Sequence, residues 1–173
     1  MNKFWIAKEQ QGYTLIELVM VMVIIAILSV AIMVSISSYK TQHLRAAADR
    51  ILSDLNYAKN IAEISNKWMG ITFSTVSNSY SLYETDGITD TTIKDTSNSG
   101  RDYTIVLAND YSGVIISSVN IGSGTKVEFN PRGMPFTDKT AGALGSNGLI
   151  TLSQGNSSAV ITIDYQSGRI NIP

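Results

Sequence analysis

The chain has 173 residues, enough for one ordinary domain with an appended segment. Its 13 Lys and Arg against 14 Asp and Glu give a formal charge of −1, so no strongly basic surface for nucleic acid is expected. Cysteine is absent, which excludes disulfides, zinc–thiolate sites, iron–sulfur clusters and cysteine nucleophiles. With one histidine, His43, a Ser-His-Asp triad or a multi-histidine metal site is hard to build, so a conventional hydrolase is not expected.

The N-terminal part is strongly apolar. Residues 18–36 contain no charged residue, no Gly and no Pro. Residues 13–36 would span roughly 36 Å as a helix, more than the roughly 30 Å hydrocarbon core of a bilayer. The sequence therefore predicts a transmembrane helix over residues 13–36. Lys3 and Lys8 precede it and favour a cytoplasmic N-terminus, with the remainder of the chain on the far side of the membrane.

Glu17 lies inside this apolar segment. A carboxylate at membrane depth costs a few kcal/mol and is expected to have a partner and a purpose. Alternatively, Glu17 reaches the lipid headgroups. A second alternative for the whole segment is an ordinary secretory signal, because Ser29-Val30-Ala31 has the small-x-small pattern of a signal peptidase site and would leave Ile32 first. Glu17 is unusual for the apolar part of such a signal.

Residues 11–17 read Gln-Gly-Tyr-Thr-Leu-Ile-Glu. This segment resembles the class III signal of type IV pilins and type II secretion pseudopilins, with Tyr13 in place of the usual Phe. The resemblance implies a leader peptide of residues 1–12, cleavage between Gly12 and Tyr13 by a prepilin peptidase, and N-methylation of Tyr13. It also implies that Glu17 pairs with the N-terminal amine of a neighbouring subunit during assembly. Such pairing would remove two isolated charges from an apolar bundle.

A helical pattern continues beyond the apolar segment. Small and apolar residues recur at steps of three or four as far as about Ser65, which predicts one helix of about fifty residues whose second half, 37–66, is amphipathic. The expected apolar positions are Leu44, Ala47, Ala48, Ile51, Leu55, Ala58 and Ala62. Charged residues occupy other positions of this segment: Asp49, Arg50, Asp54, Lys59 and Glu63.

The remaining residues, 67–173, predict a β-rich globular domain. A hairpin is expected from 68–73 and 80–83 around Ser77-Asn78-Ser79, followed by a polar surface loop over 85–100. Further strands are expected at 103–107, 114–119, 126–130, 149–152, 159–165 and 169–172. The predicted fold is α+β and pilin-like: a long N-terminal helix, transmembrane in its first half and amphipathic in its second, packed on antiparallel β-sheet.

Three further segments narrow the resemblance. Residues 47–59 are similar to the small-residue helix of the minor pseudopilin H (GspH/FimT) family, with Lys59 where an Arg is more usual. Residues 129–133 resemble that family's Phe-x-x-x-Gly turn, and residues 161–170 its closing hairpin with Gly-Arg. On these resemblances, the chain is identified as a member of this family.

The resemblance implies a minor pseudopilin of a type II secretion system, a non-enzymatic fibre or tip subunit without a cofactor. Its expected partners are the prepilin peptidase, other pseudopilins or pilins, and the inner membrane. The N-terminus would be cytoplasmic and the C-terminal domain periplasmic. This domain would join the fibre after processing, while the apolar helix holds the fibre together.

The alternative is a minor type IV pilin in pilus assembly or DNA uptake. Related DNA receptors carry Gly-Arg-x-Arg, whereas residues 168–171 read Gly-Arg-Ile-Asn and lack the second Arg. Nucleic acid is therefore not expected as a partner, and in the alternative DNA binding would depend on a local cluster of Arg132, Lys139 and Arg169. In the opposing interpretation, Arg169 is a structural or solvated turn residue.

No metal site is expected. Asp86, Asp90 and Asp95 lack the alternating oxygen ligands and closing Glu of an EF-hand. His43 is interpreted as a solvated helix residue. The aromatic residues of the second part are interpreted as sheet packing: Trp68, Phe73, Tyr80, Tyr83, Tyr103 and Tyr111.

Overall fold

The computed structural model describes residues 12–95 and 100–173, without the side chains of residues 30–40. Nearly all of the predicted leader, residues 1–11, lies outside the described residues. The chain divides into two units, Met1–Tyr39 and Lys40–Pro173, and each is described by itself. The helix α1, Leu15–Ser65, contributes residues to both.

The N-terminal unit contains the first part of α1. Thr14 caps this helix: the backbone N–H of Glu17 donates to the Thr14 hydroxyl at 3.3 Å and to its carbonyl at 3.1 Å. Thr and Glu at this spacing match the capping-box pattern, which explains why the helix starts here. Among the residues that the structure describes, no helix has both the length and the apolar character needed to cross a membrane. The predicted span of 13–36 includes residues whose side chains are not described.

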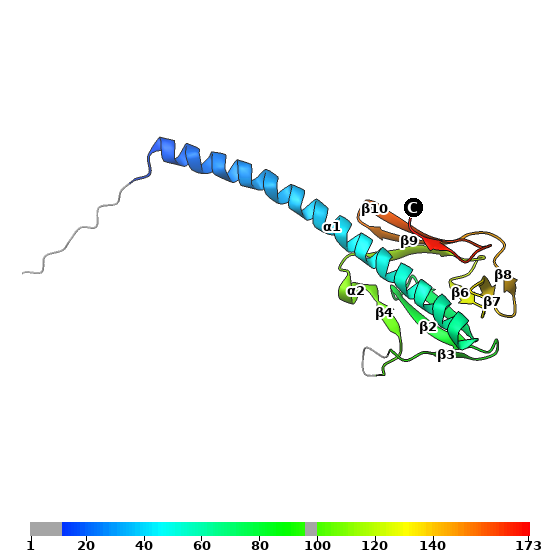
Figure 1. Cartoon of the computed structure of the whole chain (residues 1–173). Helices are drawn as coiled ribbons and strands as arrows, with labels where there is room; N and C mark the ends of the chain where they lie inside the picture. Colours follow the sequence, from blue (N-terminus) through cyan, green and yellow to red (C-terminus); the bar gives the residue numbers. More distant parts are fainter. Residues whose placement is uncertain (1–11, 96–99) are drawn as a thin grey trace, which may run out of the picture. The chain divides into compact units, whose positions relative to one another are not determined.

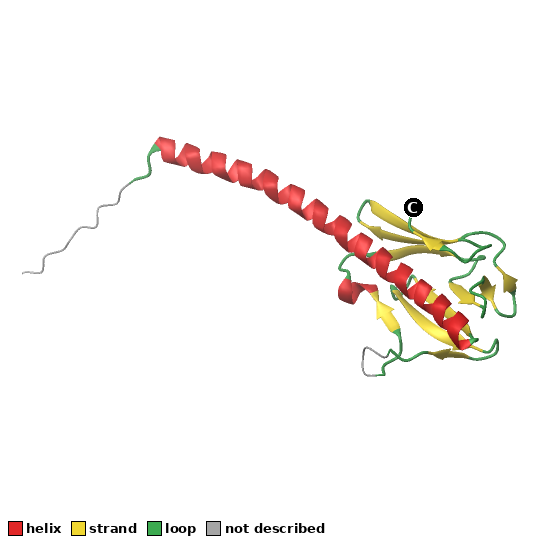
Figure 2. Ribbon diagram, viewed as in Figure 1, coloured by secondary structure: helices red, strands yellow, loops and turns green. Residues whose placement is uncertain are grey.

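The second unit combines the last part of α1 with eleven strands and a short helix, labelled where there is room in Figure 1 and coloured by type in Figure 2. The elements are β1 (Trp68–Ser74), β2 (Ser79–Thr85), β3 (Asp90–Thr92), β4 (Thr104–Val106), α2 (Leu107–Asp110), β5 (Ile115–Asn120), β6 (Lys126–Phe129), β7 (Pro135–Asp138), β8 (Gly142–Ala143), β9 (Gly148–Gln154), β10 (Ser157–Ile163) and β11 (Ile170–Asn171).

The strands form two antiparallel sheets. One has seven strands in the order β3-β2-β1-β6-β7-β8, with β4 also paired to β2. The other has four strands in the order β11-β10-β9-β5. The predicted hairpin is confirmed, because β1 and β2 pair from Trp68↔Thr85 to Ser74↔Ser79. Its turn contains Asn78 at φ 50°, and asparagine tolerates this left-handed conformation better than most residues.

The core lies between α1 and the two sheets. All seven small and apolar positions expected on one face of α1 are buried, each 4% exposed or less. They belong to one cluster with buried residues of both sheets, among them Ile71, Phe129, Ile150 and Ile161. Among the side chains that the structure describes, every buried hydrophobic residue lies between Leu44 and Ile170, so the unit Lys40–Pro173 has a core of its own and is expected to fold alone.

Several strand predictions needed correction. The expected loop over 85–100 contains β3, and the expected strand 103–107 ends at Val106 because Leu107 begins α2. Neither β7 nor β8 was expected. Strand β7 was not expected because it contains Pro135, and proline lacks the backbone N–H that a strand donates. Proline is tolerated as the first residue of a strand, which is the position of Pro135 in β7.

Candidate functional site

The predicted processing site lies at the start of the N-terminal unit. Gly12 is exposed, and no atom of the other described residues apart from its chain neighbours lies within 4 Å of the position that a Cβ would take. Tyr13 is 85% exposed. Glu17 is also exposed, with its backbone in the first turn of α1. The structure thus leaves the predicted cleavage bond accessible and places Glu17 one helical turn after it.

Within the described part of its unit, the first part of α1 has no apolar cover. Every large hydrophobic side chain from Leu15 to Leu28 is exposed, from 46% at Val19 to 83% at Leu15. A continuous apolar surface of this kind normally contacts lipid or another protein. Because these residues extend around the whole helix rather than along one stripe, they suit a surrounding apolar medium.

The three family-like segments of the sequence meet at one place in the folded domain. Gly133, in the turn between β6 and β7, has φ 71°, and Gly168, between β10 and β11, has φ 63°. A Cβ added to Gly168 would overlap the carbonyl oxygen of Gly133. Lys59 of α1 donates its ammonium to the Gly168 carbonyl at 3.1 Å. We call Lys59, Gly133 and Gly168 the glycine junction; it joins α1 to both sheets.

Both glycines suit this geometry, and Gly168 more strictly, because its close neighbour is a backbone atom. A Cβ on Gly133 would also collide with the Glu63 carboxylate and would lie 2.7 Å from the Lys59 Cε. Left-handed backbone and close approach together favour glycine over every other residue. The junction therefore gives a physical reason for the glycine that follows Arg132 and for the glycine that precedes Arg169.

A second polar cluster is buried between α1 and the seven-stranded sheet. Asp54 is 4% exposed, although it lies among the charged positions of the helix. Its carboxylate accepts hydrogen bonds from the Tyr80 hydroxyl at 2.7 Å, the Tyr103 hydroxyl at 3.0 Å and the Arg50 Nε at 3.1 Å. We call these four residues the Asp54 cluster. Burial and the neighbouring carboxylate raise the pKa of Tyr80, which keeps its hydroxyl a donor.

Tyr103 of this cluster is expected to titrate late. Burial and the Asp54 carboxylate raise the pKa of Tyr103 from 10.0 to about 12. A raised folded-state pKa favours the protonated form, so its contribution to stability is complete below pH 10 and is lost as the pH rises through about 12. In an absorbance titration at the tyrosinate band, Tyr103→Phe should lack one of the tyrosine deprotonation steps that the parent chain shows at high pH. An ordinary titration of Tyr103 near pH 10 would contradict this arrangement.

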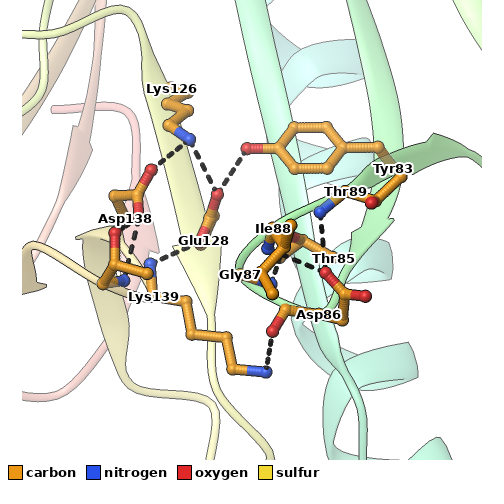
Figure 3. A network of polar contacts seen from close by, with 11 residues as sticks. Tyr83, Thr85, Asp86, Gly87, Ile88, Thr89, Lys126, Glu128, Asp138 and Lys139 are labelled. Carbon is orange, nitrogen blue, oxygen red and sulfur yellow. Dashed lines mark hydrogen bonds and ion pairs between the residues drawn. The ribbon is translucent and has the colours of Figure 1, made fainter.

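The seven-stranded sheet carries a third polar network on its other face (Figure 3). Glu128 is 1% exposed and accepts hydrogen bonds from the Tyr83 hydroxyl at 2.9 Å, the Lys126 ammonium at 3.1 Å and the Lys139 backbone N–H at 2.6 Å. Lys126 also pairs with Asp138 and holds the pKa of that carboxyl below its usual range. This buried carboxylate has a full set of donors, so the network serves structure.

The predicted cationic contacts occupy different environments. The Lys139 ammonium donates to the Asp86 carbonyl at 2.8 Å and lies 5.6 Å from the Trp68 ring centre, so it is engaged within the domain. Arg132 and Arg169 are exposed and directly adjoin the two glycines of the glycine junction. Arg132 and Arg169 thus precede and follow glycines of this junction in the chain, whereas Lys139 has partners elsewhere. DNA binding by these residues stays a prediction.

The acidic loop has a local role. The Asp86 carboxylate accepts the backbone N–H groups of Ile88 at 2.8 Å and Thr89 at 2.7 Å, and these bonds lower the Asp86 pKa. Within the described residues, no group of three or more His, Asp or Glu side chains could hold a metal ion. His43, expected to be solvated, is half-buried.

Sequence reasoning missed the buried acids. Periodicity alone places Asp54 among the charged positions of the helix and Glu128 in a strand. No neighbouring residue in the sequence marks either of them as buried. The available signal was the tyrosines, because a hydroxyl needs a partner when buried. The hydroxyls of Tyr80, Tyr83 and Tyr103 all donate to one of these two acids, and the Tyr103 ring stacks on Tyr57 of α1. The expected packing is confirmed by Phe73 against Tyr80, with ring centres 5.7 Å apart.

The fold resembles that of a minor pseudopilin whose structure has been solved. The minor pseudopilin EpsH from the type 2 secretion system of Vibrio cholerae matches with a TM-score of 0.55 and 9% identity, covering 76% of this chain and 96% of that chain. The type IV minor pilin FimU of Pseudomonas aeruginosa gives a TM-score of 0.49 at 14% identity, covering 77% of this chain and 90% of that one. Among curated proteins, none matches the sequence.

Two family models match in succession. The prokaryotic N-terminal methylation motif matches residues 7–33, which include Gly12, Tyr13 and Glu17. The type II transport protein GspH model matches residues 47–167, more than half of the chain, and this range includes the glycine junction's Lys59 and Gly133. With an N-terminal methylation motif followed by this domain on an α+β pilin-like fold, the chain belongs to the type II transport protein GspH family.

Proposed function

We propose that this chain is a minor pseudopilin of a type II secretion system, a structural fibre subunit that performs no chemistry. The observation that carries this proposal is the N-terminal methylation motif over residues 7–33, directly ahead of a GspH domain. The exposed apolar part of α1 supports it, because such a surface needs a lipid or helical environment. The domain Lys40–Pro173, with its own core, would act as the fibre's outward-facing part.

The proposed life cycle has two stages. The precursor is held in the inner membrane by residues 13–36, with the N-terminus cytoplasmic and the folded domain periplasmic. A prepilin peptidase removes residues 1–12, and the new amine of Tyr13 is methylated. The mature chain then leaves the bilayer for a fibre whose helices pack together.

Glu17 has two separable roles in this proposal. Its place three residues after Thr14 suits a capping box, and its charge suits pairing with the Tyr13 amine of a neighbouring subunit. Glutamine also serves at this capping position, so Glu17→Gln should keep the helix start but remove the charge. Leaving the partner amine uncompensated in an apolar bundle costs a few kcal/mol, so incorporation should fall by more than about tenfold.

The measurement is co-expression of the full chain with a prepilin peptidase and a major pseudopilin, followed by cross-linking and quantification of the chain in sheared fibres. Thr14→Ala is the matched control, because it removes the capping hydroxyl and leaves the charge. We expect processing of all three chains, with incorporation lost only in Glu17→Gln. Equal incorporation of Glu17→Gln and the parent chain would refute the pairing role, as would an equal loss in Thr14→Ala.

A further inference from the structure

A hollow lies at one end of the four-stranded sheet, where β10 turns into β11. It has a volume of about 390 Å³, within the range that is usual for small-ligand sites. All of the residues that line it have polar side chains, in contrast to the apolar core beneath the same sheet. We call it the polar hollow, and its lining residues are Asn147, Thr162, Asp164, Ser167, Arg169 and Asn171.

The strand register sets the floor of the polar hollow. Thr162 lies between two isoleucines of β10 whose side chains are fully buried, so alternation along the strand turns Thr162 to the outer face. Asn171 of β11 is its cross-strand partner and therefore lies on the same face. Asn147 stands at the rim, where its Oδ1 accepts the backbone N–H of Tyr165 at 3.3 Å. The floor thus consists of side chains held by a paired sheet.

The backbone of β10 is already paired on both sides here. Strand β9 pairs with Thr162 and Ile163 on one side, and β11 pairs with the same two residues on the other. The turn between β10 and β11 is closed by the Asp164 N–H, which donates to the Arg169 carbonyl at 2.8 Å. A ligand over this face of β10 therefore meets side chains rather than unpaired peptide groups.

Several of these side chains have hydrogen-bonding groups to spare. Within the described part of the chain, the Thr162 hydroxyl, the Asn171 amide and the Arg169 guanidinium form no hydrogen bond. A hydroxyl and a side-chain amide each donate and accept, whereas a guanidinium only donates. The polar hollow therefore offers both donors and acceptors to a ligand.

The polar hollow carries no net charge. Arg169 and Asp164 are its two charged lining residues, and they have opposite signs. Hydrogen bonds from Ser167 lower the pKa of Asp164, and the charge of Arg169 acts in the same direction, so the carboxylate stays ionised. An anion would be repelled by Asp164 and a cation by Arg169. Beyond the hollow, none of the four strands of this sheet contains a charged residue.

We propose that the polar hollow binds a neutral sugar unit of a glycan. A sugar ring carries several uncharged hydroxyls, each of which donates and accepts, and this matches the spare groups of Thr162, Asn171 and Arg169. The uncharged sheet face beside the hollow suits the neighbouring sugar units. A free amino acid fits less well, because Asp164 Oδ1 already accepts three hydrogen bonds from its own turn. This binding goes beyond the proposed fibre role and does not depend on it.

The test uses the domain of residues 40–173 on an array of immobilised glycans. The array holds neutral oligosaccharides together with their uronate-bearing and phosphate-bearing counterparts. We expect binding to a neutral glycan, with at least about tenfold weaker binding to its acidic counterparts. The bound neutral glycan is then titrated in solution against the isotope-labelled domain. The NMR signals of Thr162, Arg169 and Asn171 should shift, and those of α2 should stay in place.

Two pairs of variants test the binding geometry. Thr162→Val removes a hydroxyl from the floor and should weaken glycan binding by about tenfold. Thr151→Val is the matched control, because Thr151 lies on the same outer face but does not line the hollow, so it should bind as the parent does. Arg169→Gln should weaken binding of the neutral glycan. Asp164→Asn keeps an oxygen for the turn but leaves the hollow positive, so binding of the uronate-bearing glycan should increase. Circular dichroism checks the folding of each variant.

Four results would overturn the proposal: no bound glycan, acidic glycans bound as tightly as neutral ones, equal binding by folded Thr162→Val and Thr151→Val, or displacement of the glycan by an equal concentration of free glycine. Because residues 40–173 exclude the processing site, these outcomes are independent of cleavage at Gly12. Failure of the fibre proposal would leave the polar hollow intact, and failure here would leave the fibre proposal unaffected.

Discussion

Gly168→Ala is expected to destabilise the folded domain by about 3 kcal/mol or more. The left-handed φ of 63° alone costs an alanine about 1–2 kcal/mol. The larger part comes from the added Cβ, which would overlap the carbonyl oxygen of Gly133, a backbone atom that cannot rotate away as a side chain does. Relief would require the two turns to separate and would stretch the Lys59 hydrogen bond to Gly168.

The chain offers a matched control. Gly155 has nearly the same φ, 59°, but no atom lies within 4 Å of its Cβ position. Gly155→Ala should therefore lose only the backbone contribution, about 1–2 kcal/mol. Urea unfolding of residues 40–173, followed by circular dichroism, measures both variants. Equal losses in the two would mean that the close approach of the two turns contributes nothing.

Asp54→Ala is the second large effect, with an expected loss of about 2–4 kcal/mol in the free energy of unfolding. It leaves the hydroxyl of Tyr80, a residue 1% exposed, without its acceptor and removes the partner of Arg50. Removing one member of a buried ion pair costs about 3–5 kcal/mol, but the Arg50 side chain is 42% exposed and can regain water, which reduces the loss.

Asp49→Ala is the control for this prediction, because Asp49 is an exposed carboxylate on the same helix. Its replacement should change the free energy of unfolding by no more than about 0.5 kcal/mol. Tyr80→Phe should cost about 1 kcal/mol, because Asp54 keeps Tyr103 and Arg50 as donors. A loss in Asp54→Ala no greater than that in Asp49→Ala would show that the cluster does not stabilise the domain.

Local patterns were sufficient to predict the helix and the first hairpin. The predicted helix end at about Ser65 is confirmed, because the apolar positions from Leu44 to Ala62 repeat with the helical period and all are buried. The hairpin of β1 and β2 follows from two short apolar runs around a turn at Asn78. Both signals involve residues that are neighbours in the sequence.

Contacts between distant segments could not be predicted in this way. The division of the strands into two sheets depends on which strand lies beside which, and short strands such as β7 and β8 carry little pattern of their own. The burial of Asp54 depends on Tyr80 and Tyr103, which come from separate elements. The glycine junction likewise arises only when the turns after β6 and β10 meet on α1.

The candidate site shows the same contrast. Gly12, Tyr13 and Glu17 lie in one short segment whose resemblance to the pilin signal implies cleavage and pairing, and the methylation motif matches the same residues. Arg132, Lys139 and Arg169 were grouped by charge alone. In the folded domain Lys139 contacts Asp86 and Trp68, while Arg132 and Arg169 adjoin the glycine junction.

Processing of the N-terminus tests the central claim most directly. The full chain, expressed with and without a prepilin peptidase, is analysed by intact mass and N-terminal peptide mass spectrometry. Gly12→Val serves as the control, because open space around Gly12 means that a block reflects recognition rather than folding. The pseudopilin account predicts a mature chain that starts at N-methylated Tyr13 only with the peptidase present. A chain that starts at Ile32, or that stays uncleaved beside an active peptidase, would contradict it.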